Sequence, residues 1–384
     1  MATHPAVVTV GPGLPLEILQ VPTPTPTGNE IRVRALWTAS TPLDLHQADG
    51  GLLVQHPQLL GDGVAGRVVE VGPHATKYQP GDIVFGFTWR NQAEKAHQEY
   101  VVAPEFLFGK LPHNVTMQQA VTLPNNFVTA WHTLTKEFGF DLPWPKPDGY
   151  LPEAQERDAG ILIWGGSSSV GQFALQILKH YGYTRVITTA SRAHHEKLHH
   201  HYGAAKCFDY RDPDVERDII SFAEPHERAT TADPVAKNGL AYILDCIGSL
   251  QGSVLPVSRI ARLTATSRGT KVAVLLPIII TDPSPGGKPV YEMDVLAAAA
   301  DWPVGVEAVG VRTHSYLDDA ALKDKLQSEI MPSVLERGIV EPNEQLIVEG
   351  ATMLERAEKA LTLLRDKKVS GERLVWRVAD SHED

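Results

Sequence analysis

Residues 161–179 read ILIWGGSSSVGQFALQILK, and this stretch decides the fold. Its apolar start predicts a buried strand, its glycines and serines a tight turn, and its last part an amphipathic helix. In such a unit the backbone N–H groups of the turn can approach a pyrophosphate, and the helix N-terminus adds partial positive charge. Ser168 stands where the strict G-x-G-x-x-G fingerprint has its middle glycine, and serine is small enough for the same approach. We therefore expect a dinucleotide site; the alternative is a plain strand-to-helix connection.

The next predicted strand, residues 185–191, ends where a dinucleotide site distinguishes NAD from NADP. An NAD site usually places Asp or Glu there, whereas this chain offers Ser191, Arg192 and Lys197. A hydroxyl, a guanidinium and an ammonium would bind a 2′-phosphate that a carboxylate would repel. The sequence thus favours NADPH. The alternative is that Arg192 and Lys197 are ordinary solvated charges.

Further apolar runs follow this unit and alternate with helical segments, which predicts a parallel, doubly wound sheet. The first 125 residues differ, because short apolar runs separated by Pro and Gly predict a β-rich, barrel-like domain. After the sheet, residues 317–336 and 353–367 read as amphipathic helices. A last strand over residues 373–378 is expected to return to the first domain.

Length and composition limit the class of protein. A chain of 384 residues favours two domains, and a net charge of −11 disfavours nucleic acid and anionic membranes as partners. No apolar run reaches the length of a membrane span, and no signal peptide is visible, so a cytoplasmic protein is expected. With Cys207 and Cys246 as its two cysteines, the chain cannot build a zinc site of several thiolates.

Several motifs together resemble one family. They are the PGDIV run at 80–84, the glycine-rich run at 61–66, Thr129-Ala130, the Gly-Ser turn, and the VSG run at 369–371. Over nearly its whole length the chain resembles the medium-chain dehydrogenase/reductases, especially the zinc-independent quinone oxidoreductases and the fungal trans-acting enoyl reductases. The resemblance implies an α/β fold: a Rossmann doubly wound parallel sheet at 131–314, plus a β-rich GroES-like twisted barrel, the catalytic domain, at 1–130 and 315–384.

Departures from the zinc enzymes of this family are informative. Those enzymes place a cysteine in the segment that here covers residues 39–44, and Gly-His-Glu where this chain has Gly61-Asp62-Gly63. Neither the cysteine nor the four-cysteine zinc lobe is present, so we expect no metal. His195 and His199 are spaced i, i+4 and could hold zinc; the preferred interpretation is an exposed polar helix face.

Without a metal the substrate must itself be electrophilic, as an α,β-unsaturated carbonyl or a quinone is. Hydride addition leaves an enolate, which needs hydrogen-bond donors and a proton. By resemblance Thr129 contacts the cofactor; Asn125 or Asn126 could donate to the carbonyl oxygen, and His46, whose unperturbed pKa lies near neutrality, could supply the proton. The alternatives are that Asn125 or Asn126 caps a helix beginning near Phe127, and that His46 is a plain loop residue.

The resemblance also implies the residues that contact NADPH, beginning with Thr41, Pro42, Asp44 and Thr129 at the nicotinamide. The rest are Gly166, Ser167, Ser168, Ser169, Val170 and Gly171 at the pyrophosphate, Ser191, Arg192, Lys197 and Tyr210 at the adenosine phosphate, and Ile247, Gly248, Leu275, Leu276, Val369 and Ser370 elsewhere along the cofactor.

The expected partner is a small-molecule substrate, an enone, enoyl thioester or quinone, with a polyketide synthase as a further candidate. Monomer and homodimer both stay open, because Pro277, Pro283 and Pro285 would interrupt strand addition at the edge. Two other functions stay open as well. One is a carbonyl reductase or alcohol dehydrogenase on the same fold, and the other an NADPH-binding protein that works only with a synthase.

Overall fold

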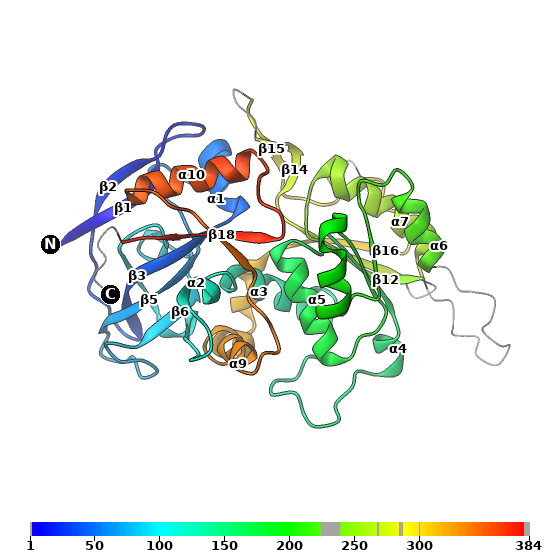
Figure 1. Cartoon of the computed structure of the whole chain (residues 1–384), viewed down its shortest axis with the longest axis horizontal. Coiled ribbons are helices and arrows are strands. Elements are labelled where there is room, and N and C mark those ends of the chain that lie inside the picture. The colour runs from blue at the N-terminus through cyan, green and yellow to red at the C-terminus, as the bar shows by residue number, and fades with distance from the viewer. Residues whose placement is uncertain (1, 224–238, 267–268, 284–286, 299, 380–384) are drawn as a thin grey trace. The chain divides into compact units, whose positions relative to one another are not determined.

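The computed structural model describes residues 2–223, 239–266, 269–283, 287–298 and 300–379. They form two compact units (Figure 1). The first unit contains the chain up to Val128, residues 282–289 and the chain from Ser315, and the second contains Thr129–Thr281 and Val290–His314. Among the described helices, none is both long and apolar enough to cross a membrane.

The second unit is built on a six-stranded parallel sheet in the order β11-β10-β9-β12-β13-β16. All five residues of the central strand β9 are buried, which explains its continuous apolar sequence. The strand order reverses between β9 and β12, and ligands of such sheets bind beyond the carboxyl ends of the strands at this point. The strands are β9 (Gly160–Trp164), β10 (Val186–Thr189), β11 (Lys206–Phe208), β12 (Leu240–Asp245), β13 (Thr270–Leu275) and β16 (Val306–Val311).

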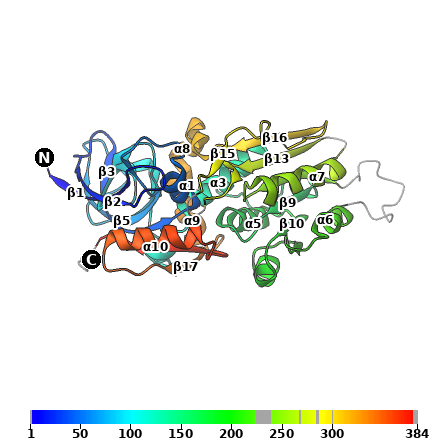
Figure 2. The same ribbon diagram turned by 90° about the horizontal axis from the view of Figure 1, so that it is seen from above.

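Helices cover this sheet. On one face α6 (Val215–Ala223) and α7 (Leu255–Thr264) share a buried cluster with Leu162, Ile243 and Val272, and Figure 1 shows the two helices side by side. Figure 2 shows the same sheet from above. The remaining elements of this unit are α4 (Ala154–Arg157), α5 (Ser169–Tyr181), the C-terminal part of α3 (Pro124–His132), the antiparallel pair β14 (Ile278–Thr281) and β15 (Val290–Glu292), the 3₁₀ turn Arg192–His194, and the π-helical turns Thr133–Glu137, Lys197–His201 and Leu250–Val254.

The first unit is β-rich. Its largest sheet has the order β17-β18-β3-β5-β6-β8, with β7 also paired to β3, and a smaller sheet has the order β2-β1-β4. The strands are β1 (Thr3–Thr9), β2 (Glu17–Pro22), β3 (Glu30–Ser40), β4 (Gln58–Leu59), β5 (Gly63–Val71), β6 (Ile83–Phe87), β7 (Tyr100–Pro104), β8 (Phe108–Lys110), β17 (Glu344–Ile347) and β18 (Glu372–Arg377). The helices and turns are α1 (Pro42–Gly50), α2 (Met117–Ala120), α8 (Ala320–Lys325), α9 (Met331–Glu336) and α10 (Met353–Arg365), with Gln92–Glu94, Glu105–Leu107, Thr313–Asp318 and Leu326–Ile330.

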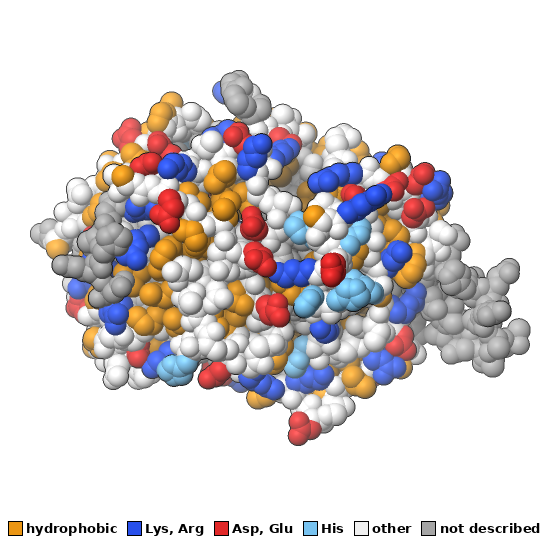
Figure 3. Space-filling model, in the orientation of Figure 1, with side chains coloured by type: hydrophobic (Ala, Val, Ile, Leu, Met, Phe, Trp, Pro, Cys, Tyr) orange, Lys and Arg blue, Asp and Glu red, His pale blue; other side chains and the backbone are white. Residues whose placement is uncertain are grey.

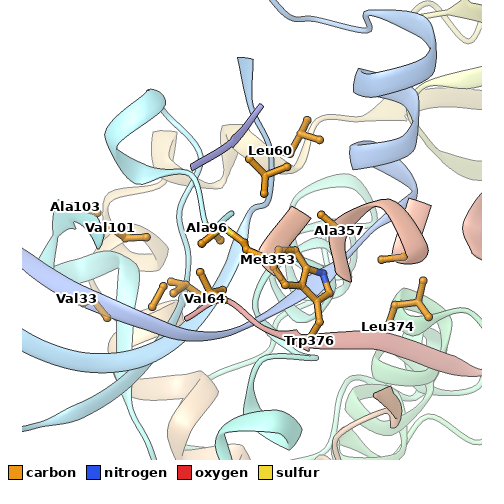
Figure 4. Close-up of a cluster of buried hydrophobic side chains, with 14 of the residues drawn as sticks. Val33, Leu60, Val64, Ala96, Val101, Ala103, Met353, Ala357, Leu374 and Trp376 are labelled. Carbon is orange, nitrogen blue, oxygen red and sulfur yellow. The ribbon is translucent and has the colours of Figure 1, made fainter. Parts of the chain in front are cut away.

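The C-terminal segment completes the core of this unit. β18 pairs antiparallel with β3, so the predicted return of the tail to the first domain is confirmed. Trp376 of β18 is fully buried next to Met353 of α10 (Figure 4), and its indole N–H donates to Ser40 Oγ at 2.9 Å. A large aromatic side chain in such a position stabilises the core through its buried apolar area.

One predicted helix differs. Instead of a single helix over residues 317–336, the chain forms a 3₁₀ segment, α8, a π-helical turn and α9. Asp319 begins α8 by accepting hydrogen bonds from the N–H groups of Ala321 and Leu322. A side chain that satisfies the first N–H groups of a helix sets its start, which here separates α8 from the preceding 3₁₀ turn.

Candidate functional site

The turn after β9 has the shape that a pyrophosphate requires. A Cβ at Gly166 would lie 2.0 Å from Thr188 Oγ1, and one at Gly171 would lie 2.5 Å from the carbonyl oxygen of Gly165. Ser168 is the N-cap of α5 and accepts from the N–H of Gly171 at 3.1 Å. The N–H groups of the first turn of α5 have no carbonyl four residues back to bond, so, apart from that of Gly171, they are available to an anion. The turn therefore fits a dinucleotide phosphate.

The turn after β12 is held by a residue that the sequence analysis missed. The carboxylate of Asp245 is fully buried and accepts from the N–H groups of Ile247 at 2.8 Å and Gly248 at 3.1 Å, and from Ser253 Oγ at 2.6 Å. Burial raises the pKa of Asp245 to about 6, against the lowering effect of these donors. An acidic residue at the end of an apolar strand, shortly before a glycine, was the available signal. Asp245 fixes the backbone on which the expected cofactor residues Ile247 and Gly248 lie.

Ser191 and Arg192 follow β10 at the carboxyl edge of the sheet. Ser191 is buried, whereas the side chain of Arg192 is 80% exposed and its Nε lies 3.5 Å from Asp209 Oδ2. This exposed guanidinium is available to a phosphate group, and Asp209 holds it near the end of β11.

Lys197 and Tyr210, the other two residues predicted at the adenosine phosphate, contact different neighbours. The ammonium of Lys197 lies 5.4 Å from the ring centre of Tyr202. Tyr210 is half exposed, and Arg211 contacts it, with Nε 3.3 Å from the phenol oxygen. Arg211 is thus a second guanidinium close to a predicted cofactor residue, and it was not among the residues predicted from the sequence.

The other candidates of the second unit are more enclosed. Thr129 Oγ1 lies 2.8 Å from Thr313 Oγ1. Leu276 packs against Gly310 and the apolar cluster under α7, and Leu275 ends β13 half-buried.

In the first unit, Asp44 connects two backbone segments, the start of α1 and the segment at Gly61. It forms a capping box with Thr41 at the start of α1, where Pro42 is the first helical residue. Its Oδ2 accepts from the N–H of Thr41 at 2.7 Å, and its Oδ1 accepts from the N–H of Gly61 at 2.9 Å. Burial, followed by the neighbouring charge of Asp62, raises the pKa of Asp44 to about 6. Thr41 and Asp44 are 3% and 1% exposed, so both act as structural clamps as well as cofactor candidates.

His46 and Asn125 were the expected donors of this unit. Burial lowers the pKa of His46 to about 4, so its ring is neutral at pH 7. α3 begins at Pro124, which places Asn125 and Asn126 inside its first turn rather than before a helix starting near Phe127. The side-chain amide of Asn126 donates to the carbonyl of Thr122 at 3.4 Å.

The C-terminal cofactor candidates of this unit are Val369 and Ser370. Ser370, in the connection to β18, is exposed, and Val369 packs partly against the core of this unit.

A buried ion pair stands where zinc relatives have a metal ligand. The ammonium of Lys95 lies 2.7 Å from Asp62 Oδ1, and the two residues are 6% and 2% exposed. The described part of the chain contains no group of three or more His, Cys, Asp or Glu side chains arranged to hold a metal. Thirty-three residues separate Lys95 from Asp62, and no sequence pattern signalled their contact.

The histidine-rich segment is the other metal alternative raised by the sequence. His195 Nε2 lies 3.0 Å from the carbonyl oxygen of Ala190, and His199 Nδ1 lies 2.6 Å from that of Ala204. Each ring therefore uses one nitrogen on the backbone of its own segment, while His199, His200 and His201 are exposed. Figure 3 shows histidines gathered on one face among Lys, Arg and acidic side chains.

Comparison with known proteins agrees with this geometry. Residues 27–133 match the alcohol dehydrogenase GroES-like domain. The chain is 35% identical over 250 residues to the dehydrogenase pigH of Monascus ruber, a match that covers 62% of this chain and 65% of that protein. It is 31% identical over 286 residues to the trans-enoyl reductase tazE of Aspergillus terreus, covering 71% of this chain and 86% of that protein. The chain spans somewhat less than two thirds of the length of pigH.

Solved structures share the fold. A putative zinc-dependent alcohol dehydrogenase from Rhizobium etli superposes with a TM-score of 0.71 at 20% identity, covering 98% of each chain. The quinone oxidoreductase from Coxiella burnetii gives 0.69 at 20% identity, covering 98% of this chain and 100% of that one. A mycobacterial protein complexed with NADPH gives 0.66 at 22% identity, with the same coverage. The predicted fold class, a Rossmann sheet with a GroES-like domain, is confirmed. The chain belongs to the medium-chain dehydrogenase/reductase superfamily, in the group that includes enoyl reductases and quinone oxidoreductases.

We predict that Gly61→Ala destabilises the first unit much more than Gly81→Ala. Both glycines have positive φ, at +85° and +98°, but a Cβ at Gly61 would lie 2.2 Å from the His97 ring while one at Gly81 meets nothing within 4 Å. The backbone strain costs about 1–2 kcal/mol at either position, and displacing a packed ring adds about 1–3 kcal/mol at Gly61. Urea unfolding of the two variants measures the difference. Equal losses of stability would contradict the packing argument.

We also predict that His97→Phe makes the protein less sensitive to acid. Burial lowers the pKa of His97 to about 3; the charge of Asp62 raises this pKa and that of Lys95 lowers it, both by less than burial does. The unfolded chain takes up a proton at this residue below about pH 6.5 and the folded chain does not, so stability falls as pH drops from 6.5 toward 3. Removing the group should shrink the loss in unfolding free energy between pH 7 and pH 5 by about 2 kcal/mol.

Urea unfolding at both pH values tests this prediction. His113→Phe is the matched control, because His113 is exposed and its ring is in water in both states. A His97→Phe variant with the same pH dependence as the parent protein would contradict the prediction.

Proposed function

We propose that the chain is an NADPH-dependent, zinc-independent oxidoreductase that reduces an activated C=C bond, in an enone or enoyl thioester, or a quinone. The observation that carries this proposal is the turn at 165–171, in which a Cβ at Gly166 would collide with Thr188 and one at Gly171 with the backbone. When bound, NADPH supplies the hydride. The names of the relatives, a dehydrogenase and a trans-enoyl reductase, support the same class of reaction.

In this proposal the second unit binds the phosphate groups of NADPH. Ser168 and the first N–H groups of α5 bind the pyrophosphate, and Asp245 keeps the turn that carries Ile247 and Gly248 in place. The exposed guanidinium of Arg192 binds the adenosine 2′-phosphate, which favours NADPH over NADH. The NADPH complex of the mycobacterial protein supports this choice.

Zinc independence rests on the available ligands. Asp62 is the one carboxylate at the position where zinc relatives place a histidine, and its Oδ1 is bonded to the ammonium of Lys95. A cation in direct contact with the carboxylate competes with a metal ion for the same oxygens. The reaction then needs a substrate that accepts hydride without Lewis-acid activation, as conjugated carbonyls and quinones do. We keep Asn125 and Thr129 as candidate polar contacts to substrate and cofactor.

The test is a cofactor-oxidation assay with the purified full chain. NADPH deuterated at C4 is mixed with an enone, an enoyl thioester, a quinone or a simple ketone, each with and without chelator. We expect chelator-insensitive oxidation with one of the first three and, for the first two, deuterium at the β-carbon. Activity on the ketone alone, lost with chelator, would overturn the proposal in favour of a zinc alcohol dehydrogenase. Comparing free with carrier-bound enoyl thioesters tests the candidate synthase partner.

We predict that Arg192→Glu weakens NADPH binding about 10- to 100-fold and leaves NADH binding nearly unchanged. The substitution places a carboxylate near the 2′-phosphate, and that group is absent from NADH. Cofactor fluorescence titration gives both dissociation constants. Arg217→Glu is the control, since Arg217 is an exposed arginine on α6 that also pairs with aspartates. Equal losses for the two cofactors would show that Arg192 does not read the 2′-phosphate.

A further inference from the structure

Lys95 has an environment that its role as a partner of Asp62 does not fully explain. Lysine is rarely so deeply buried, because its ammonium must give up its hydration. The ammonium has three N–H donors, and among the described residues the structure gives it one acceptor, Asp62 Oδ1 at 2.7 Å. Two strong donors therefore have no protein partner in the described part of the chain.

The groups beside this pair also have unused bonding capacity. Thr88 donates its backbone N–H to the carbonyl of Asp62 at 2.8 Å, yet its buried side-chain hydroxyl has no hydrogen-bond partner among the described residues. His97 follows Lys95 by two residues, is 1% exposed, and likewise has no hydrogen bond to either ring nitrogen. Leaving buried polar groups unbonded costs free energy. Both residues lie next to the ion pair, Thr88 through its backbone bond to Asp62 and His97 through the charges of Asp62 and Lys95, and the spare donors of Lys95 can be completed by a polar ligand atom.

The backbone around the pair is tightly fixed. The N–H of Ala96 donates to the carbonyl of Gly61 at 2.9 Å, and that of His97 donates to the carbonyl of Leu60 at 3.0 Å. Asp44 Oδ1 holds the N–H of Gly61 from the other side at 2.9 Å. The ammonium is consequently aimed by rigid neighbours, which is the condition under which a charge stabilises a transition state effectively.

The balance of charge indicates the class of ligand. Asp62 already neutralises Lys95, so a full anion such as a free carboxylate would meet Asp62 and Asp44 as well as the ammonium. A neutral carbonyl oxygen avoids this repulsion, because it accepts one N–H and gains negative charge only as the reaction proceeds. In a site of low dielectric constant, a fixed cation stabilises such developing charge strongly.

We propose that the ammonium of Lys95, held by Asp62, binds the carbonyl oxygen of a neutral conjugated substrate and stabilises the enolate that hydride addition creates. The inference rests on the proposed function, and it names both the catalytic residue and the substrate class. Bound NADPH would supply a hydride to the β-carbon and be left as NADP⁺, while the C=C electrons would shift toward the carbonyl oxygen. Lys95 keeps its proton and donates a hydrogen bond to the enolate oxygen. Water then delivers a proton to the α-carbon.

The decisive variant is Lys95→Met combined with Asp62→Leu. Replacing both partners avoids leaving an unpaired buried carboxylate, so the protein keeps its fold. The matched control is Lys110→Met with Asp82→Leu, which removes a pair of the same length, 2.7 Å, whose lysine side chain is 65% exposed. We expect kcat/KM for an enoyl thioester to fall at least 100-fold in the Lys95 variant while NADPH affinity stays within twofold. The control should retain full activity. The single variant Lys95→Arg, which keeps a cation beside Asp62, should be more active than the Lys95→Met, Asp62→Leu variant.

A spectroscopic measurement tests the contact without a variant. The saturated thioester with a ¹³C-labelled carbonyl is bound to the wild-type protein with NADP⁺, and its infrared C=O stretch is recorded. We expect a shift to lower frequency than in water, and no such shift in the Lys95→Met, Asp62→Leu protein. A kinetic comparison tests the ligand class. Because free crotonate is a full anion, the wild-type protein should reduce it at least 100-fold less efficiently than its neutral thioester.

The outcomes separate the two proposals. If the wild type reduces the thioester and the folded double variant does so within threefold, or if the bound carbonyl shows no shift, the role of Lys95 is wrong and the proposed function stands. If the wild type oxidises neither cofactor with any acceptor, the proposed function is wrong. The carbonyl shift then still decides whether Lys95 binds this ligand class.

Discussion

The carboxylate of Asp44 is the contact on which the first unit depends. One oxygen accepts from the N–H of Thr41 and the other from the N–H of Gly61, so a single side chain joins the start of α1 to the segment that leads into β5. Asp62 follows at once and holds Lys95. Lys95, the group proposed to stabilise the enolate oxygen, is therefore positioned by this carboxylate through Gly61 and Asp62.

Keeping four charged side chains at such depth requires a close balance of charge. Asp44 and Asp62 are opposed by Lys95 and by Arg373 of β18, whose pKa burial lowers to about 10. The raised pKa of Asp44 shows that the balance is incomplete, because burial and Asp62 outweigh the two N–H donors and Lys95. A ligand oxygen that accepts from Lys95 without adding a full negative charge fits this environment better than an anion does.

The sequence predicted what local pattern determines. The run at 161–179 contained strand, turn and helix within nineteen residues, and the structure has β9 and α5 there. The return of the tail was also predictable, because an apolar strand after a long helix needs a sheet to join. Asp245 lay at a recognisable strand end but is important through contacts that only the fold creates. The helix over residues 317–336 was predicted as one piece because apolar periodicity does not reveal the cap at Asp319.

The role of Lys95 could not be predicted from the sequence, because Asp62 is thirty-three residues away and neither residue belongs to a recognisable motif. The chemistry that the Lys95–Asp62 pair can support follows from the difference between an ammonium and a metal ion. A bound zinc ion lowers the pKa of a coordinated oxygen acid and so assists removal of a proton from an alcohol. An ammonium already paired with a carboxylate can stabilise a developing enolate but offers no open coordination position for an alkoxide. In the proposed function, the buried ion pair at the position of a metal ligand therefore favours reduction of conjugated carbonyls over oxidation of alcohols on the same fold.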